Sequence, residues 1–251
     1  MMDGVAFWML AVLASVLVGM GKGGLPVVGM LSVPVLAMVP GISPVTAAGL
    51  LLPLYVVSDM FGLYAYRHAF NARVLAIIIP AGTLGVAIGY FTATLVSEAW
   101  VTVLIGVIGV VFALNLLIRR QVIVEPKRAE VAPGVFWGAV TGFTSFVSHS
   151  GGPPYQVYTM PLGLSKAVFA GTSTIAFAYI NAIKLIPYYM LGQVNLLSLE
   201  KVLVLMPVAA ISVFAGVGLV KRLPERLFFQ LVTWALLLVS IKLMWDGFKA
   251  I

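Results

Sequence analysis

The sequence predicts an all-α polytopic membrane protein with about ten transmembrane segments, arranged as two inverted repeats of five helices. Of the 251 residues, 62% are hydrophobic and only 9% are charged, whereas soluble domains carry about 25% charged residues. Proline, glycine and the few charged residues divide the apolar sequence into ten segments, and the two halves of the chain resemble each other. A soluble globular protein is therefore excluded.

The ten apolar segments are predicted to be membrane helices. A helix needs about 20 apolar residues to cross a hydrocarbon core about 30 Å thick, and backbone groups that face lipid must be satisfied within the segment. The segments 134–148 and 153–163 are too short to cross alone at about 1.5 Å per residue, so we expect the break between them to lie inside the membrane. In order, the predicted segments are 5–21, 25–40, 44–66, 73–94, 98–118, 134–148, 153–163, 166–190, 199–220 and 225–248.

A polar stretch divides the chain into halves that repeat each other. Residues 119–133 are expected to form a cytoplasmic linker between a first five-helix repeat (1–118) and a second (134–251). The first segment follows Asp3 rather than a basic stretch, so we expect it to be kept as a span and not cleaved as a secretory signal. Landmarks recur at a spacing of 122 to 128 residues. The matching pairs include Gly41 and Gly163, Gly49 and Gly171, Asp59 and Asn181, Gly89 and Gly216, and Gly23-Gly24 with Gly151-Gly152.

The distribution of positive charges favours ten crossings. If all ten segments cross, eleven of the fifteen Lys and Arg residues, Lys22 among them, fall on one side of the membrane, and that side is expected to be cytoplasmic. Five spans in each half would invert the second repeat relative to the first. The alternative is eight crossing helices with the second and seventh segments as re-entrant loops.

Two glycine motifs predict the substrate site. Residues 21–26 read Gly-Lys-Gly-Gly-Leu-Pro, and residues 148–154 read Ser-His-Ser-Gly-Gly-Pro-Pro. Each motif describes the exposed N-terminus of a helix, where free N–H groups and the positive end of the helix dipole bind anions; the alternative is a pair of ordinary turns. The substrate-binding residues predicted on this basis are Lys22, Gly23, Gly24, Ser148, His149, Ser150, Gly151, Gly152, Gln156 and Asn181.

Ionisable residues inside apolar segments predict a coupling or gating site. Asp59 lies in the third segment and Lys184 in the eighth, where charges are costly unless they are paired. Asn181 and Lys184 are one helical turn apart and share a face. Because Asp59 and Asn181 are repeat partners, we expect both at the central axis, with Lys184 close enough to pair with Asp59. A purely structural ion pair is the alternative.

Several other functions find no support. The string Gly19–Gly24 matches the dinucleotide pattern GxGxxG but follows an apolar helix instead of a strand. With no cysteine, two histidines and no HExxH motif, we expect no metal, no cofactor and no enzyme activity. The Lys and Arg residues form no basic face, so no nucleic-acid partner is expected. Gly85 and Gly89, repeated as Ser212 and Gly216, predict close helix packing within the chain or across a homodimer.

At its glycine breaks the sequence resembles the sulfite exporter TauE/SafE family, which belongs with the toluene-sulfonate uptake permeases. The resemblance rests on the motif 21–26, its partner 151–154, and the stretches 44–49 and 163–172. It implies a transporter of the bacterial inner membrane for sulfite or organosulfonates. Because the sequence has no ATP-binding motif and its halves repeat, we expect a secondary transporter that exports sulfite or a related small sulfur-containing or organosulfonate anion by alternating access. Lys22 and His149-Ser150 depart from the family pattern. The alternatives are a passive anion channel and an integral-membrane enzyme acting on a lipid or thiol.

Overall fold

The computed structural model describes residues 4–42, 44–93, 95–118, 127–191 and 199–251. Every regular element in these ranges is helical. Eight of the helices are long and apolar enough to cross a membrane. These are α1 (Val5–Lys22), α4 (Pro44–Tyr66), α5 (Ala72–Thr92), α6 (Glu98–Ile118), α7 (Val131–Ser148), α9 (Lys166–Met190), α10 (Leu199–Arg222) and α11 (Glu225–Ala250). The predicted all-α class is confirmed, with eight helices in these ranges that could span a membrane.

The second and seventh predicted segments are short, interrupted elements. Residues 25–40 were expected to be one helix, and the structure corrects this to two helices, α2 (Pro26–Met30) and α3 (Ser32–Leu36). Pro34 has no N–H to donate to the Met30 carbonyl, so a hydrogen bond of a continuous helix is missing where α2 ends. The seventh segment forms α8 (Gly152–Thr159), followed by the 3-10 turn η1 (Met160–Leu162).

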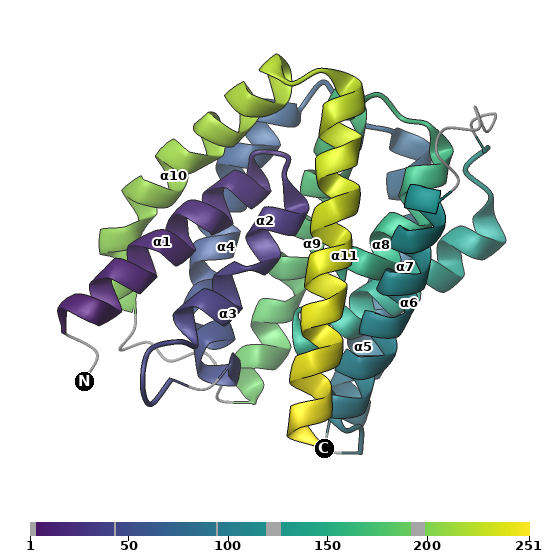
Figure 1. Ribbon diagram of the computed structural model, residues 1–251. Coiled ribbons are helices and arrows are strands. Elements are labelled where there is room, and N and C mark those ends of the chain that lie inside the picture. Colours follow the sequence, from purple (N-terminus) through teal and green to yellow (C-terminus); the bar gives the residue numbers. More distant parts are fainter. Residues whose placement is uncertain (1–3, 43, 94, 119–126, 192–198) are drawn as a thin grey trace.

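The connections between helices gather at two opposite ends of the molecule (Figure 1). The start of α1 and the end of α11 lie at the lower end, and the α4–α5 and α10–α11 connections lie at the upper end. Lys166 Nζ donates to the carbonyls of Lys221, at 3.0 Å, and Leu223. Arg73 Nε donates to the Ala129 carbonyl at 2.8 Å. We call the upper end the basic end and the other the terminal end.

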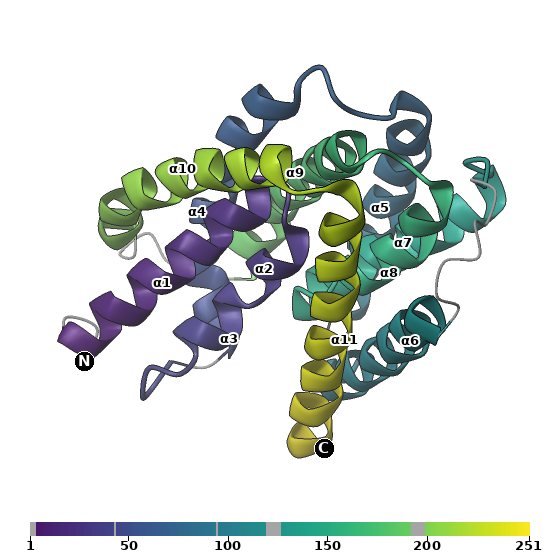
Figure 2. The ribbon, with the colours of Figure 1, turned by 45° about the horizontal axis from the view of Figure 1, so that its top comes forward.

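Helices of the two halves pack against each other in matched pairs. Helix α1 packs along α10, and α7 along α5; α4 packs on α9, and α6 on α11. Figure 2 shows the α1–α10 pair on one side of the molecule and the α6–α11 pair on the other.

Glycines allow these helices to approach closely. A Cβ added to Gly142 would overlap the Gly82 carbonyl, and one added to Gly19 would overlap the Ala209 carbonyl. Gly216 lies against Gly23 in the same way, and Gly89 against Phe146. The small-residue faces predicted from the sequence therefore serve packing within one chain.

Candidate functional site

A small cavity lies between the two halves of the chain. Its volume is about 80 Å³, and its lining comes from α1, α2, α4, α7, α8 and α9. Residues of both glycine motifs meet there, together with the ionisable residues of α9. Its polar lining residues are Lys22, Tyr55, Ser145, His149, Ser173, Thr174, Asn181 and Lys184. We call this the central cavity.

Lys22 and Asp59 form a buried ion pair beside the central cavity. The Lys22 ammonium lies 2.6 Å from Asp59 Oδ1, and the two residues are 8% and 3% exposed. Lys22 ends α1, where a cation is favoured by the negative end of the helix dipole. Gly62 allows the approach, because a Cβ there would lie 2.9 Å from the Lys22 carbonyl oxygen. The charge count assumed that Lys22 is one of the surface charges that orient the chain. Its burial in this ion pair contradicts that assumption.

Asp59 also joins the two halves. Its Oδ2 accepts a hydrogen bond of 2.9 Å from Asn181 Nδ2 on α9. The sequence prediction that these repeat partners meet is confirmed. Through Lys22, Asp59 and Asn181, a single chain of polar contacts connects α1, α4 and α9.

Lys184 has a different partner from the one predicted. Its ammonium donates to the Ser145 carbonyl at 3.0 Å and to Ser145 Oγ at 3.1 Å, and the residue is 1% exposed. The two Asp59 oxygens are engaged by Lys22 and Asn181. Lys184 therefore binds Ser145, in the C-terminal part of α7. Among the described residues, therefore, two buried ammonium groups share one carboxylate. The cluster of Lys22, Asp59 and Lys184 carries a formal charge of +1.

His149 is fixed at the break between α7 and α8. Its backbone adopts a left-handed conformation with φ of 52° at the end of α7, which is uncommon for a residue other than glycine. The Tyr188 hydroxyl donates to the Phe146 carbonyl at 2.7 Å and lies 2.8 Å from His149 Nε2. Because a tyrosine hydroxyl has one hydrogen, His149 Nε2 is the donor in the second contact.

The glycines of the first motif serve helix packing. The Gly23 N–H donates to the Gly19 carbonyl at 2.8 Å, and the Gly24 N–H to the Gly21 carbonyl at 3.2 Å. Gly24 has a φ of +105°, and its α-carbon faces the Tyr66 hydroxyl. Helix α2 has only five residues. Gly23 and Gly24 thus close α1 and pack against neighbouring helices, and their N–H groups already have acceptors.

The second glycine motif contributes only part of its residues to the central cavity. His149 and Gly152 line the cavity, but Pro153 and Pro154 leave the first turn of α8 without two of its N–H groups. The remaining predicted residues lie outside the lining. Ser148 Oγ donates to the Thr144 carbonyl, and Ser150 Oγ donates to the Ser148 carbonyl. Gly151 packs against Ser145 and Thr141. Gln156 is fully buried, and its amide has no hydrogen-bond partner among the described residues.

The predicted site left out several residues of the cavity lining, including Tyr55, Ser145, Ser173 and Thr174. Tyr55 places its ring 5.2 Å from the Lys22 ammonium, and its hydroxyl bonds the Ser32 hydroxyl. Ser145 holds Lys184. Ser173 is buried, and its hydroxyl lies beside the hydroxyl of Tyr155. The spacing of Ser173, Phe177 and Asn181 along α9 places them on one helical face, and this signal points to Ser173.

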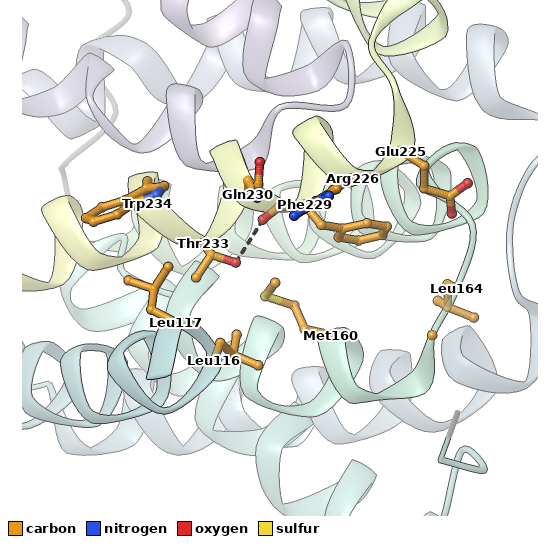
Figure 3. Close-up of a pocket in the computed structure, with 11 residues that line it drawn as sticks. Leu116, Leu117, Met160, Leu164, Glu225, Arg226, Phe229, Gln230, Thr233 and Trp234 are labelled. Atoms are coloured by element: carbon orange, nitrogen blue, oxygen red, sulfur yellow. Dashed lines mark hydrogen bonds between the residues drawn. The ribbon is translucent and has the colours of Figure 1, made fainter. Parts of the chain in front are cut away.

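Two larger hollows lie outside the central cavity. One, of about 580 Å³, opens at the terminal end and shares Met30, Tyr55 and His149 with the cavity. The other, of about 980 Å³, is a groove between α6, η1 and α11 at the basic end, and Figure 3 shows Arg226 and Glu225 near its polar end and Trp234 further along it. The described lining of this groove shares no residue with the central cavity.

Long apolar helices around a buried, charged cavity define a multi-pass membrane protein with a polar site in its interior. The family model described as "Sulfite exporter TauE/SafE" matches residues 5–243, nearly the whole chain. The chain therefore belongs to the TauE/SafE sulfite exporter family and is a membrane transporter of that family. Neither a curated protein nor a solved structure matches it.

Proposed function

We propose that this protein is a secondary transporter that exports sulfite across the bacterial inner membrane by alternating access, with the anion bound in the central cavity. The observation that carries the proposal is the buried Lys184 ammonium, which faces the cavity and has only Ser145 as a hydrogen-bonding partner among the described residues. A buried cation without a counter-charge is costly by several kcal/mol. A bound anion supplies that counter-charge.

The other groups around the cavity suit an oxyanion. The amide of Asn181 and the hydroxyls of Ser145, Ser173 and Tyr55 line the cavity together with Lys184. Hydrogen bonds to ionised oxygens are about twice as strong as those between neutral groups. The proposed binding set keeps Lys22, His149, Gly152 and Asn181 from the predicted substrate site. It adds Lys184, which was predicted as a coupling or gating residue, and Tyr55, Ser145 and Ser173.

The size of the cavity favours an inorganic anion over an organosulfonate. One water molecule needs about 10–15 Å³ of such volume, so the central cavity of about 80 Å³ corresponds to about five to eight waters. Sulfite, with one sulfur and three oxygens, is of this size. Cavities that bind drug-sized molecules measure about 300–1,000 Å³, and an aromatic sulfonate would need the cavity to expand.

The helix packing supports two inverted repeats and ten passes of the chain. A shift by the repeat spacing places α1 on α7 and α5 on α10. The α1–α10 pair therefore corresponds to the α7–α5 pair, and both pairs are present. The same shift places α4 on α9 and α6 on α11, so each of these two pairs corresponds to itself, as expected for helices at a two-fold axis. In this arrangement residues 1–118 and 134–251 form the repeats, α2–α3 and α8–η1 are interrupted passes, and the basic end is cytoplasmic.

Asp59 provides an element that couples the two repeats. Its hydrogen bond to Asn181 crosses between the first half and the second, and its ion pair with Lys22 lies in the cavity wall. When the halves rock apart, the Asp59–Asn181 bond breaks and the carboxylate becomes open to a proton. Asp59, with Lys184 nearby, then links proton binding to the change of conformation.

Transport assays in proteoliposomes test the proposed function. The purified protein is compared with sulfite, sulfate, taurine and sulfoacetate, each with and without a proton gradient. We expect sulfite to be moved fastest, with saturation and with stimulation by the gradient. Equal rates for taurine and sulfite would contradict the size argument, and rates that do not saturate would favour a passive channel.

A further inference from the structure

The barriers on the two sides of the central cavity are unequal. Toward the basic end, the wall is a packed cluster that includes Leu25, Tyr66, Phe169, Val217 and Phe228, each less than a tenth exposed. The Tyr66 hydroxyl donates to the Gly23 carbonyl at 2.7 Å and ties α4 to the end of α1. The route to the cytoplasmic side is closed in this conformation by side chains of α4, α9, α10 and α11.

Toward the terminal end, three side chains separate the central cavity from a much larger hollow. Met30, Tyr55 and His149 line both the cavity and the hollow of about 580 Å³. The hollow extends from these residues to Glu98 and Ala99 at the start of α6 and to Lys249 at the end of α11. We call it the vestibule.

Two of the three shared residues lie at interruptions of helices, and the third contacts an interrupted segment. Met30 ends α2, just before the break to α3, and His149 occupies the break between α7 and α8. The Met30 sulfur touches the other broken segment, since a Cβ on Gly152 would lie 2.5 Å from it. Tyr55 is anchored by its hydroxyl to Ser32 on α3. A small shift of either interrupted segment therefore changes the width of the passage.

We infer that the vestibule is the water-filled exit route from the central cavity to the outside, and that Met30, Tyr55 and His149 form its gate. The inference rests on the proposed transport function for the identity of the anion, but the route itself is testable without transport. It assigns this conformation to an outward-facing state with a closed gate. Opening toward the outside requires only the movement of these three side chains. Opening toward the cytoplasm requires the packed cluster around Tyr66 and Phe169 to separate.

The absence of cysteine from the sequence makes the route directly measurable. Single cysteines are introduced as Thr102→Cys in the vestibule, Ser173→Cys in the central cavity and Leu164→Cys at the basic end. Each is treated with a membrane-impermeant methanethiosulfonate in right-side-out and inside-out vesicles. Sulfite is omitted during labelling, because it attacks disulfides and thiol reagents.

Thr102→Cys is expected to react only from the outside and Leu164→Cys only from the cytoplasmic side. Ser173→Cys is expected to react slowly from the outside, and about tenfold faster when Met30→Ala is added, since loss of the thioether shifts the gate toward its open state. Met9→Ala, a change at an exposed methionine of α1, is the matched control and should leave labelling of Ser173→Cys unchanged.

Two results would overturn the inference. Failure of Thr102→Cys to react from outside would identify the vestibule as a lipid-filled groove. Labelling of Ser173→Cys that is not accelerated by Met30→Ala would remove the gate. The membrane-bound yield and thermal unfolding of each variant show whether it has folded and inserted. Sulfite transport is measured separately on the wild-type protein, so a labelling pattern as expected without sulfite transport would reject the proposed function and leave the route standing.

Discussion

Lys22 and Asp59 form an ion pair of 2.6 Å inside the apolar body of the protein. The pair connects the end of α1 to the middle of α4, and Asp59 extends the contact to Asn181 on α9. Removing one partner of a buried pair leaves an uncompensated charge, whereas removing both partners leaves none. The two kinds of change therefore separate the pair's structural role from its role in transport.

The first prediction concerns stability. Lys22→Met is expected to lower the free energy of unfolding by about 3–5 kcal/mol, because it leaves the Asp59 carboxylate buried without its cation. Adding Asp59→Asn should restore most of the loss. Thermal unfolding in detergent, followed for wild type, each single variant and the double variant, measures the effect.

An exposed ion pair provides the control. Lys242 and Asp246 also lie 2.6 Å apart, but their side chains are 43% and 45% exposed. Lys242→Met should cost at most about 1 kcal/mol, as for other surface pairs. A comparable loss for Lys22→Met and Lys242→Met would mean that water reaches the Lys22–Asp59 pair.

The second prediction separates Lys184 from Lys22. Lys184→Met removes a cation that has no carboxylate partner among the described residues, so it should leave the thermal stability unchanged or raise it. We expect its affinity for sulfite to fall at least about tenfold, equivalent to about 1.4 kcal/mol of binding free energy. Stabilisation of the protein by increasing sulfite concentration reports the affinity. Unchanged affinity would place the anion elsewhere.

The third prediction concerns coupling. The double variant Lys22→Met with Asp59→Asn keeps Lys184, so it should still bind sulfite, more weakly because Lys22 is lost, but should lose the stimulation of transport by a proton gradient. Uptake is measured from pH 5.5 to 8 beside wild type, because sulfite itself changes its charge in this range. The other charged or titratable groups at the site, Lys184, Tyr55, His149 and Tyr188, are unchanged. Stimulation equal to that of wild type would leave Asp59 a structural role.

Much of the helical framework follows from the sequence because apolar stretches between charges have lengths set by the bilayer. The predicted segments 44–66, 98–118 and 166–190 have the same bounds as α4, α6 and α9. The second predicted segment does not match a single helix. Hydropathy treats Pro34 and Gly29 as acceptable within one span, but residue 34 has no backbone N–H to donate to the Met30 carbonyl. The repeat spacing also predicted that Asp59 and Asn181 meet, because repeat partners on central helices lie near the axis.

The partners of the two lysines were not predictable in the same way. In the sequence, Lys22 follows the apolar part of α1 and resembles a charge at the membrane surface. Its burial depends on Gly62 and Gly216, which allow α4 and α10 to approach the end of α1. Lys184 was assigned to Asp59 because it lies one helical turn from Asn181, the repeat partner of Asp59. Which lysine reaches Asp59 is decided by the tertiary packing of α1 and not by the pattern on α9.

The fourth prediction concerns the wall of the central cavity. Gly152→Val would place its side chain against Met30, and we expect loss of sulfite binding with a folded protein. Gly218→Val is the matched control, because a Cβ at Gly218 meets nothing within 4 Å. Binding is measured by the shift in unfolding temperature with sulfite, and insertion by the membrane-bound yield. Wild-type affinity in a folded Gly152→Val protein would remove the site from this location.

The last prediction concerns the path of the chain through the membrane. Ten passes place the linker and the end of the chain on opposite sides, whereas eight passes with two re-entrant loops place them on the same side. The basic connections at one end of the molecule favour the first arrangement, since Lys and Arg in short loops mark the cytoplasmic side. Reporter domains fused after residue 125 and after Ile251 are expected to be active in the cytoplasm and outside it, respectively. Two cytoplasmic reporters would reject the inverted repeat, and α2–α3 and α8–η1 would then be loops that enter and leave the membrane on one side.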